Sequence, residues 1–86
     1  MKKVEIYSHR NCSYCVRAKQ LLQARGITYE EQDVGQTPQL LTEMVTRTGG
    51  RTFPQIIIND EPIGGYTELL ALDSSQQLDN LINPSS

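Results

Sequence analysis

The order of apolar and polar positions predicts a chain that begins with a strand, a helix and a second strand. Apolar and polar residues alternate in Val4–Ser8, which is typical of a strand. Apolar positions then recur at helical spacing over Ser13–Arg25, and Gly26 suits the end of this helix. Ile27–Val34 again has the character of a strand. A strand–helix–strand unit of this kind implies a parallel pair with a right-handed crossover.

A second helix and a hairpin are predicted next. Thr37-Pro38 is typical of an N-cap followed by proline at the first helical position. Helical spacing continues to Thr48, and Gly49-Gly50 ends the helix. Pro54–Asp60 is rich in β-branched residues and predicts a strand, while Glu61–Gly65 fits a brief edge strand that tolerates its proline. Because these two strands are so close in sequence, we expect them to pair antiparallel.

Two short helices complete the pattern. Tyr66–Leu72 predicts one helix, and Ser74 with Gln77 matches a capping box for a last helix that Asn83-Pro84 ends. The whole order predicts an α/β protein with a four-stranded mixed β-sheet flanked by helices on both faces. At 86 residues, we expect a single domain over residues 1–86.

Charge and composition exclude several classes of function. A formal net charge of −2 argues against a nucleic-acid binder held by phosphate contacts. No apolar stretch approaches the roughly 20 residues of a membrane span, and Glu5 and Ser8 interrupt any signal-peptide core after the first two lysines. Basic residues concentrate in residues 1–25, so the cysteines lie in the basic part of an acidic protein. Glu31 has the pattern of an ordinary solvated charge.

The two cysteines, Cys12 and Cys15, form a C-x-x-C pair between the first strand and the first helix. Unpaired amides and the helix dipole stabilise an anion at a helix N-terminus, so a thiol there readily forms a thiolate. Arg10 and Arg17 add to this effect if they point inward. Cys12 is therefore the predicted nucleophile. Cys15, one turn further, is the predicted resolving thiol of an exchange through a mixed disulfide.

Three other interpretations of the pair stay open at this point. It could be half of a zinc site, although zinc usually takes four ligands and only His9 lies nearby. It could be a structural disulfide, although so short a loop stabilises little and such disulfides belong to oxidising compartments. It could also be a pair of buried core cysteines. The small number of cysteines favours a reducing, cytoplasmic compartment.

Two further stretches carry candidate binding chemistry. In "RTFPQI", Pro54 is either an ordinary strand-initiating proline or a cis-proline that turns the Phe53 backbone toward the cysteines. Phe53 itself is either a core aromatic or a residue exposed beside the cysteines. In "GGYTE", the Tyr66 and Thr67 amides form an anion site at a helix start, or the stretch is a plain glycine turn capped by Thr67.

These stretches together resemble the glutaredoxin family, over essentially the whole chain. The matching features, in order, are "CSYC" at Cys12–Cys15, "RAK" at Arg17–Lys19, "TFP" at Thr52–Pro54 and "GGYTE" at Gly64–Glu68. The resemblance implies a thioredoxin fold and a cis-proline at Pro54. It also implies a glutathione-dependent thiol–disulfide oxidoreductase that reduces protein disulfides and protein–glutathione mixed disulfides.

The resemblance further implies where glutathione binds. Its sulfur would join Cys12, the backbone at Phe53 would pair with the tripeptide, and its γ-glutamyl carboxylate would lie at the start of the third helix. The implied glutathione-binding residues are His9, Tyr14, Thr52, Phe53, Pro54, Gly65, Tyr66 and Thr67. Three of them depart from the family pattern, which usually has Lys in place of His9, Val in place of Phe53 and Asp in place of Thr67.

Ser13 replaces the proline of the usual C-P-Y-C motif and raises a second function from a different class. Glutaredoxins with serine here look like those that hold a [2Fe-2S] cluster across a homodimer. The ligands would be Cys12 of each subunit and two glutathione thiolates. The other implied partners are glutathione and disulfide-containing or glutathionylated proteins, with ribonucleotide reductase as a candidate target. The protein would be a monomer unless a cluster bridges two copies, and it would have no nucleic-acid or membrane partner.

Overall fold

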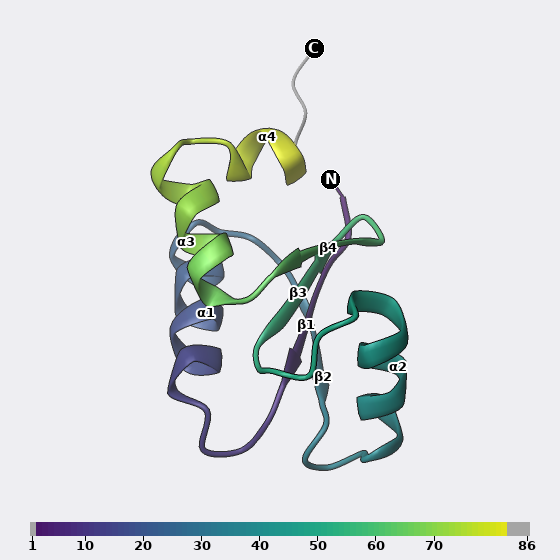
Figure 1. Cartoon of the computed structure of the whole chain (residues 1–86). Coiled ribbons are helices and arrows are strands. Elements are labelled where there is room, and N and C mark those ends of the chain that lie inside the picture. Colours follow the sequence, from purple (N-terminus) through teal and green to yellow (C-terminus); the bar gives the residue numbers. More distant parts are fainter. Residues whose placement is uncertain (1, 83–86) are drawn as a thin grey trace.

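Four strands and four helices follow one another within residues 2–82, the part of the chain that the computed structural model describes. Their order is the one that the sequence predicts, and Figure 1 shows their arrangement. The elements are β1 (Val4–Ser8), α1 (Ser13–Ala24), β2 (Glu30–Asp33), α2 (Gln39–Thr48), β3 (Gln55–Ile58), β4 (Glu61–Gly64), α3 (Tyr66–Ser74) and α4 (Leu78–Ile82).

The strands form one sheet in the order β2-β1-β3-β4. Strand β1 pairs parallel with β2 and antiparallel with β3, and β3 pairs antiparallel with β4. Helices α1 and α3 lie on one face of the sheet, and α2 lies on the other (Figure 1). The predicted mixed sheet, its parallel front pair and its closing hairpin are therefore confirmed.

Two apolar cores lie on the two faces of the sheet, because successive residues of a strand point to opposite sides. Val4 and Ile6 of β1 belong to the core that also contains Leu22 of α1. Tyr7, between Ile6 and the end of the strand, belongs to the core that contains Met44 of α2. Packing on both faces therefore fixes the end of β1, which leads directly to the cysteines.

A charged pair also joins β1 to α2. Glu5 of β1 is only 4% exposed, and Arg47 of α2 donates to both of its carboxylate oxygens, at 3.2 and 2.7 Å. The same guanidinium donates to the Tyr7 hydroxyl at 3.0 Å, and that hydroxyl donates to Glu43 at 2.7 Å. The Arg47 hydrogen bonds hold the pKa of Glu5 below its usual range. This network ties α2 to the sheet.

Two boundaries in the first half of the chain differ from the prediction. The strand predicted to start at Ile27 starts only at Glu30, because the Ile27 amide bonds to the Leu22 carbonyl and still belongs to the turn after α1. Thr37 is not the N-cap of α2, since Pro38 takes this position without a side-chain cap. Thr37 instead offers its backbone carbonyl to an amide of the first turn.

The second half brings further corrections. Strand β3 is shorter than predicted, because Asn59 and Asp60 adopt φ values of 52° and 66° in the hairpin turn. Helix α3 continues to Ser74, so the predicted capping box between Ser74 and Gln77 is wrong. The helix end predicted at Asn83-Pro84 lies outside the described residues. Within residues 2–82, no helix has the length and apolar character needed to cross a bilayer.

Candidate active site

The two cysteines lie where the chain passes from β1 into α1. Cys12 is the N-cap residue of α1, with φ −106° and ψ 101°, and its sulfur accepts a hydrogen bond from the Cys15 amide at 3.1 Å. The Val16 amide bonds to the Cys12 carbonyl at 3.2 Å. The Cys12 sulfur therefore accepts a backbone N–H at the positive end of the helix dipole, which favours an anion.

The cysteine pair is asymmetric. A disulfide joins Cys12 to Cys15, and their Cα atoms are 5.2 Å apart. Cys15 is only 1% exposed, whereas Cys12 is half-buried. Both line a surface depression of about 420 Å³, together with His9 and Lys19. The arrangement presents Cys12 to an incoming molecule and buries Cys15 behind it.

A groove of about 280 Å³ runs beside the cysteine helix, between Tyr14, the Thr52–Pro54 stretch and Gly64–Glu68. The Phe53–Pro54 peptide bond is cis, so the cis-proline that the resemblance implies is confirmed. Phe53 is half-buried, packs on the core under α2 and also lines the groove. It therefore packs on a core, as one of the two alternatives predicts, while its remaining surface lines a groove that contains neither cysteine.

Gln55 fixes one wall of this groove and was not among the predicted site residues. It is 7% exposed, and its side-chain amide donates to the Thr52 carbonyl at 2.9 Å and to the Thr52 hydroxyl at 3.1 Å. Gly50 leaves room for this amide, because a Cβ at that position would lie 2.6 Å from the Gln55 nitrogen. The sequence signal was a single polar residue at the head of an apolar strand, "PQIII".

The start of α3 also lines this groove, beside Pro54. Gly65 is its N-cap residue, and the Glu68 carboxylate accepts the Gly65 amide at 2.7 Å. The Tyr66 and Thr67 amides follow in the first turn, where amides have no partner within the helix. The groove therefore contains these amides together with Glu68, an acidic group that the sequence analysis did not assign. Gly65, and not Thr67, is the N-cap residue, so the alternative of a turn capped by Thr67 is wrong.

Aromatic contacts join segments that are far apart in the sequence. The ring centroids of His9 and Phe53 are 5.3 Å apart, and those of Tyr14 and Tyr66 are 5.8 Å apart in a stacked arrangement. The Arg17 guanidinium lies 5.6 Å from the centre of the Tyr14 ring, within cation–π range. Arg17 therefore places its charge over the groove wall.

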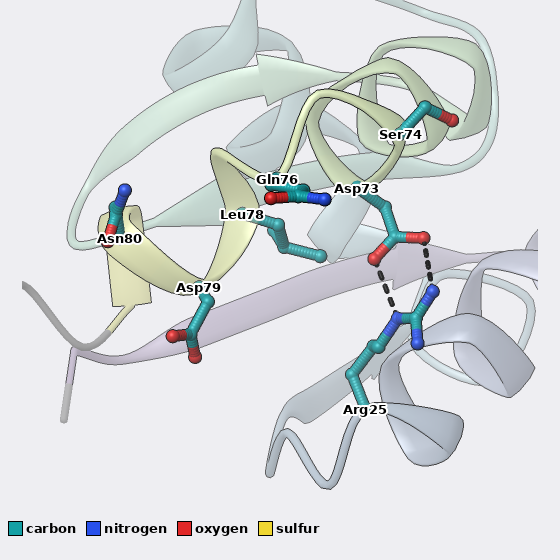
Figure 2. A pocket seen from close by; sticks show the side chains of 7 residues that line it. All are labelled: Arg25, Asp73, Ser74, Gln76, Leu78, Asp79 and Asn80. Carbon is teal, nitrogen blue, oxygen red and sulfur yellow. Dashed lines mark hydrogen bonds and ion pairs between the residues drawn. The ribbon is translucent and has the colours of Figure 1, made fainter.

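A larger hollow, of about 730 Å³, lies near the other end of α1 and contains no cysteine (Figure 2). There Arg25 makes a two-pronged ion pair with Asp73 of α3, at 2.7 and 2.8 Å. This contact lowers the pKa of Asp73 and ties α1 to α3. In the described part of the chain, no three His, Cys, Asp or Glu side chains come together as metal ligands.

Comparisons with known proteins agree with this geometry. The sequence model of the family described as Glutaredoxin matches residues 4–63. Glutaredoxin 3 of Escherichia coli (strain K12) is 42% identical over 82 residues, which cover 95% of this chain and 99% of that protein. The solution structure of a glutaredoxin from Brucella melitensis is 44% identical, with a TM-score of 0.82 over 95% of this chain and 89% of that chain.

A more distant likeness concerns the fold alone. The crystal structure of a buckwheat glutaredoxin–glutathione complex is 23% identical and has a TM-score of 0.87, over 96% of this chain and 78% of that chain. Together with the strand order and the helices on both faces, this likeness confirms the predicted thioredoxin fold.

Proposed function

Because the chain belongs to the glutaredoxin family, we propose that it reduces protein disulfides and protein–glutathione mixed disulfides with glutathione as the electron donor. Family membership and the C-x-x-C pair make it a thiol–disulfide oxidoreductase. The observation that carries the finer proposal is the asymmetry of this pair beside a groove. A reducing cytoplasm is the compartment that we propose, because the pair must return to the dithiol form between turnovers.

Cys12 is the nucleophile in this proposal. Its place at the N-terminus of α1 favours the thiolate, which is the reactive form in disulfide exchange. Its partial exposure lets a substrate sulfur approach along the S–S axis, whereas Cys15 is covered. Cys15 therefore acts second, as the resolving thiol, on a disulfide that Cys12 has already formed.

Reduction of a glutathionylated protein needs Cys12 alone. The Cys12 thiolate attacks the glutathione sulfur, and the S–S bond to the protein breaks with its electron pair on the protein sulfur. A second glutathione thiolate then attacks the glutathione sulfur held on Cys12. Glutathione disulfide leaves and the Cys12 thiolate returns, so two electrons pass from glutathione to the substrate.

Reduction of a protein disulfide needs both cysteines. Cys12 attacks one substrate sulfur and forms a mixed disulfide, and Cys15 then attacks the Cys12 sulfur and releases the reduced protein. The product is the Cys12–Cys15 disulfide, which is the state in this structure. Two molecules of glutathione return this disulfide to the dithiol and leave as glutathione disulfide.

The groove is the site that we propose for glutathione. The Thr52–Pro54 stretch, the start of α3 and Tyr14 of α1 all line this one groove, which supports the proposal. The proposed contacts come from His9, Tyr14, Thr52, Phe53, Pro54, Gly65, Tyr66 and Thr67. Glutathione carries two carboxylates, and the amides at the start of α3 suit one of them.

Two coupled assays test this proposal, with NADPH and glutathione reductase regenerating glutathione. One assay uses a glutathionylated peptide and the other a peptide with an internal disulfide. Cys12→Ser should abolish both activities, whereas Cys15→Ser should retain the first and lose the second. Thr46→Ala, an exposed change on α2, is the matched control and should retain both.

Two results would contradict the proposal. One is a wild-type protein that reduces disulfides with dithiothreitol but not with glutathione. The other is a Cys15→Ser variant that folds but loses both activities, because the two cysteines would then not have the separate roles assigned to them.

A further inference from the structure

A polar cluster of Ser8, Lys19 and Glu31 lies behind the cysteines. The Lys19 ammonium lies 2.9 Å from a Glu31 carboxylate oxygen, and the Ser8 hydroxyl donates to the same oxygen at 2.6 Å. Ser8 is 2% exposed, and the side chains of Lys19 and Glu31 keep 26% and 36% exposure. Glu31 is an exposed charge on a strand, as the sequence predicts, but its carboxylate also receives side chains from two other elements, β1 and α1.

Lys19 of this cluster lines the same depression as the two cysteines. Lys19 follows Cys15 by one helical turn, so the two side chains share one face of α1. The titratable or charged groups that line the depression there are His9, Cys12, Cys15 and Lys19, and Glu31 holds Lys19 from β2. The hydrogen bond from Ser8 and the contact with Lys19 lower the pKa of Glu31, so its carboxylate stays an anion.

We propose that Lys19 stabilises the negative charge on the Cys15 sulfur during disulfide exchange, with Glu31 and Ser8 as positioning residues that act through Lys19. The inference rests on the roles assigned to Cys12 and Cys15 in the proposed function. Cys15 is 1% exposed, and a buried thiolate lacks the water that would stabilise it. A neighbouring fixed cation supplies what the solvent does not.

The charge on Cys15 appears in only some of the reaction steps. When a thiolate attacks Cys12 in the Cys12–Cys15 disulfide, a new S–S bond forms at Cys12 and the old one breaks with its electron pair on Cys15. When Cys15 resolves a mixed disulfide, the same pair on Cys15 becomes the new bond. Reduction of a glutathionylated substrate by Cys12 alone places no charge on Cys15. Lys19 therefore acts selectively on the steps that involve Cys15.

The test removes the charge of Lys19 and measures both kinds of step. Lys19→Met keeps an unbranched side chain of similar length, Lys19→Arg keeps the charge, and Lys2→Met is the same change at the far end of β1. The first readout is the rate at which dithiothreitol reduces the Cys12–Cys15 disulfide, followed by acid quenching and alkylation of free thiols. The second is the fraction of disulfide at a fixed ratio of reduced to oxidised dithiothreitol.

We expect Lys19→Met to slow this reduction by about tenfold, the lower end of the effect of one nearby opposite charge on an ionisation equilibrium. The fraction of disulfide at equilibrium should stay within a factor of two of the wild type, because burial disfavours a resting Cys15 thiolate and its charge forms only during exchange. Lys19→Arg should restore the rate, and Lys2→Met should match the wild type. In a Cys15→Ser background, Lys19→Met should change the rate of peptide deglutathionylation by less than a factor of two.

Two results would overturn the inference, and both differ from the results that would contradict the proposed function. A Lys19→Met protein that is reduced within a factor of two of the wild-type rate overturns the inference. An equal loss of deglutathionylation rate in the Cys15→Ser background also overturns it, because Lys19→Met would then act through the structure and not through Cys15. If Lys19→Met does not fold, Lys19→Gln, which also removes the charge and keeps a polar side chain, tests the same inference, with an expected slowing that Lys19→Arg does not show. Because the first readout uses dithiothreitol, a protein that fails to use glutathione contradicts the proposed function and leaves this readout intact.

Discussion

Replacing Arg47 with methionine should destabilise the protein by about 3 kcal/mol at pH 7, because breaking a buried ion pair by removing one partner costs about 3–5 kcal/mol. The change leaves the Glu5 carboxylate, at 4% exposure, without two hydrogen bonds, and it removes a third bond to the Tyr7 hydroxyl. The lower end of this range of energies applies because the Arg47 side chain keeps 26% exposure. Lys3 also stays 3.7 Å from Glu5 and partly compensates.

Urea unfolding followed by far-UV circular dichroism measures this loss, since the chain has no tryptophan for fluorescence. Arg51→Met is the matched control. It makes the same change at an exposed arginine, and surface substitutions of this kind usually stay within about 0.5 kcal/mol. A double variant, Arg47→Met with Glu5→Gln, should recover part of the loss, because the unpaired charge is then gone.

The same pair predicts a pH dependence. The Arg47 hydrogen bonds hold the pKa of Glu5 in the folded protein below 4.5, its ordinary value. A carboxyl group of this kind contributes stability above its unfolded pKa and loses it as the pH falls through its folded pKa. The difference between the wild type and Arg47→Met should therefore shrink when the pH is lowered from 7 to well below 4.5. Two results would refute this reasoning: a stability difference between the wild type and Arg47→Met that is equal at both pH values, or a loss of stability at pH 7 no larger than that of Arg51→Met.

Three further predictions concern the turn after α2, the groove and the [2Fe-2S] cluster. Gly49 ends α2 at φ 74°, so Gly49→Ala should cost about 1 kcal/mol from backbone strain alone, visible as a lower midpoint in thermal unfolding. Gln55→Leu removes the two bonds to Thr52 and should raise KM for a glutathionylated peptide more than it lowers kcat; an unchanged KM would contradict its role in the groove wall. Anaerobic reconstitution with iron, sulfide and glutathione tests whether the protein binds the [2Fe-2S] cluster that the resemblance implies from Ser13. If it does, the wild type and Cys15→Ser should form brown dimers, and Cys12→Ser should stay colourless. A wild-type protein that stays a colourless monomer contradicts this second function.

The sequence predicts the parts of this fold that depend on local signals. Strand alternation, helical spacing and Gly49 place most elements and their order, and the C-x-x-C pair falls at the helix start as expected. Errors occur where a neighbouring segment decides the outcome. Ile27 has a strand-like side chain, but its amide completes the turn of α1. Ser74 looks like a cap, but α3 continues through it.

Side chains that act across the sheet leave almost no local signal. From the sequence, Glu31 is predicted only to be a solvated charge, because the partners of its carboxylate, Ser8 and Lys19, come from two other elements. Gln55 shows only as a polar residue beside an apolar run, although it holds the Thr52 backbone. Such contacts depend on strand register and helix placement, which the periodicity of the chain does not specify. The supporting residues of the site are therefore harder to predict than the cysteines.

The contact between His9 and Phe53 joins two parts of the site that are far apart in the sequence. Their ring centroids lie 5.3 Å apart, with the ring planes tilted by 45°. The aromatic ring of Phe53 offers His9 a face to pack on. Phe53 also packs on the core under α2, so this contact ties the loop before Cys12 to the Thr52–Pro54 stretch of the groove and to the core behind it.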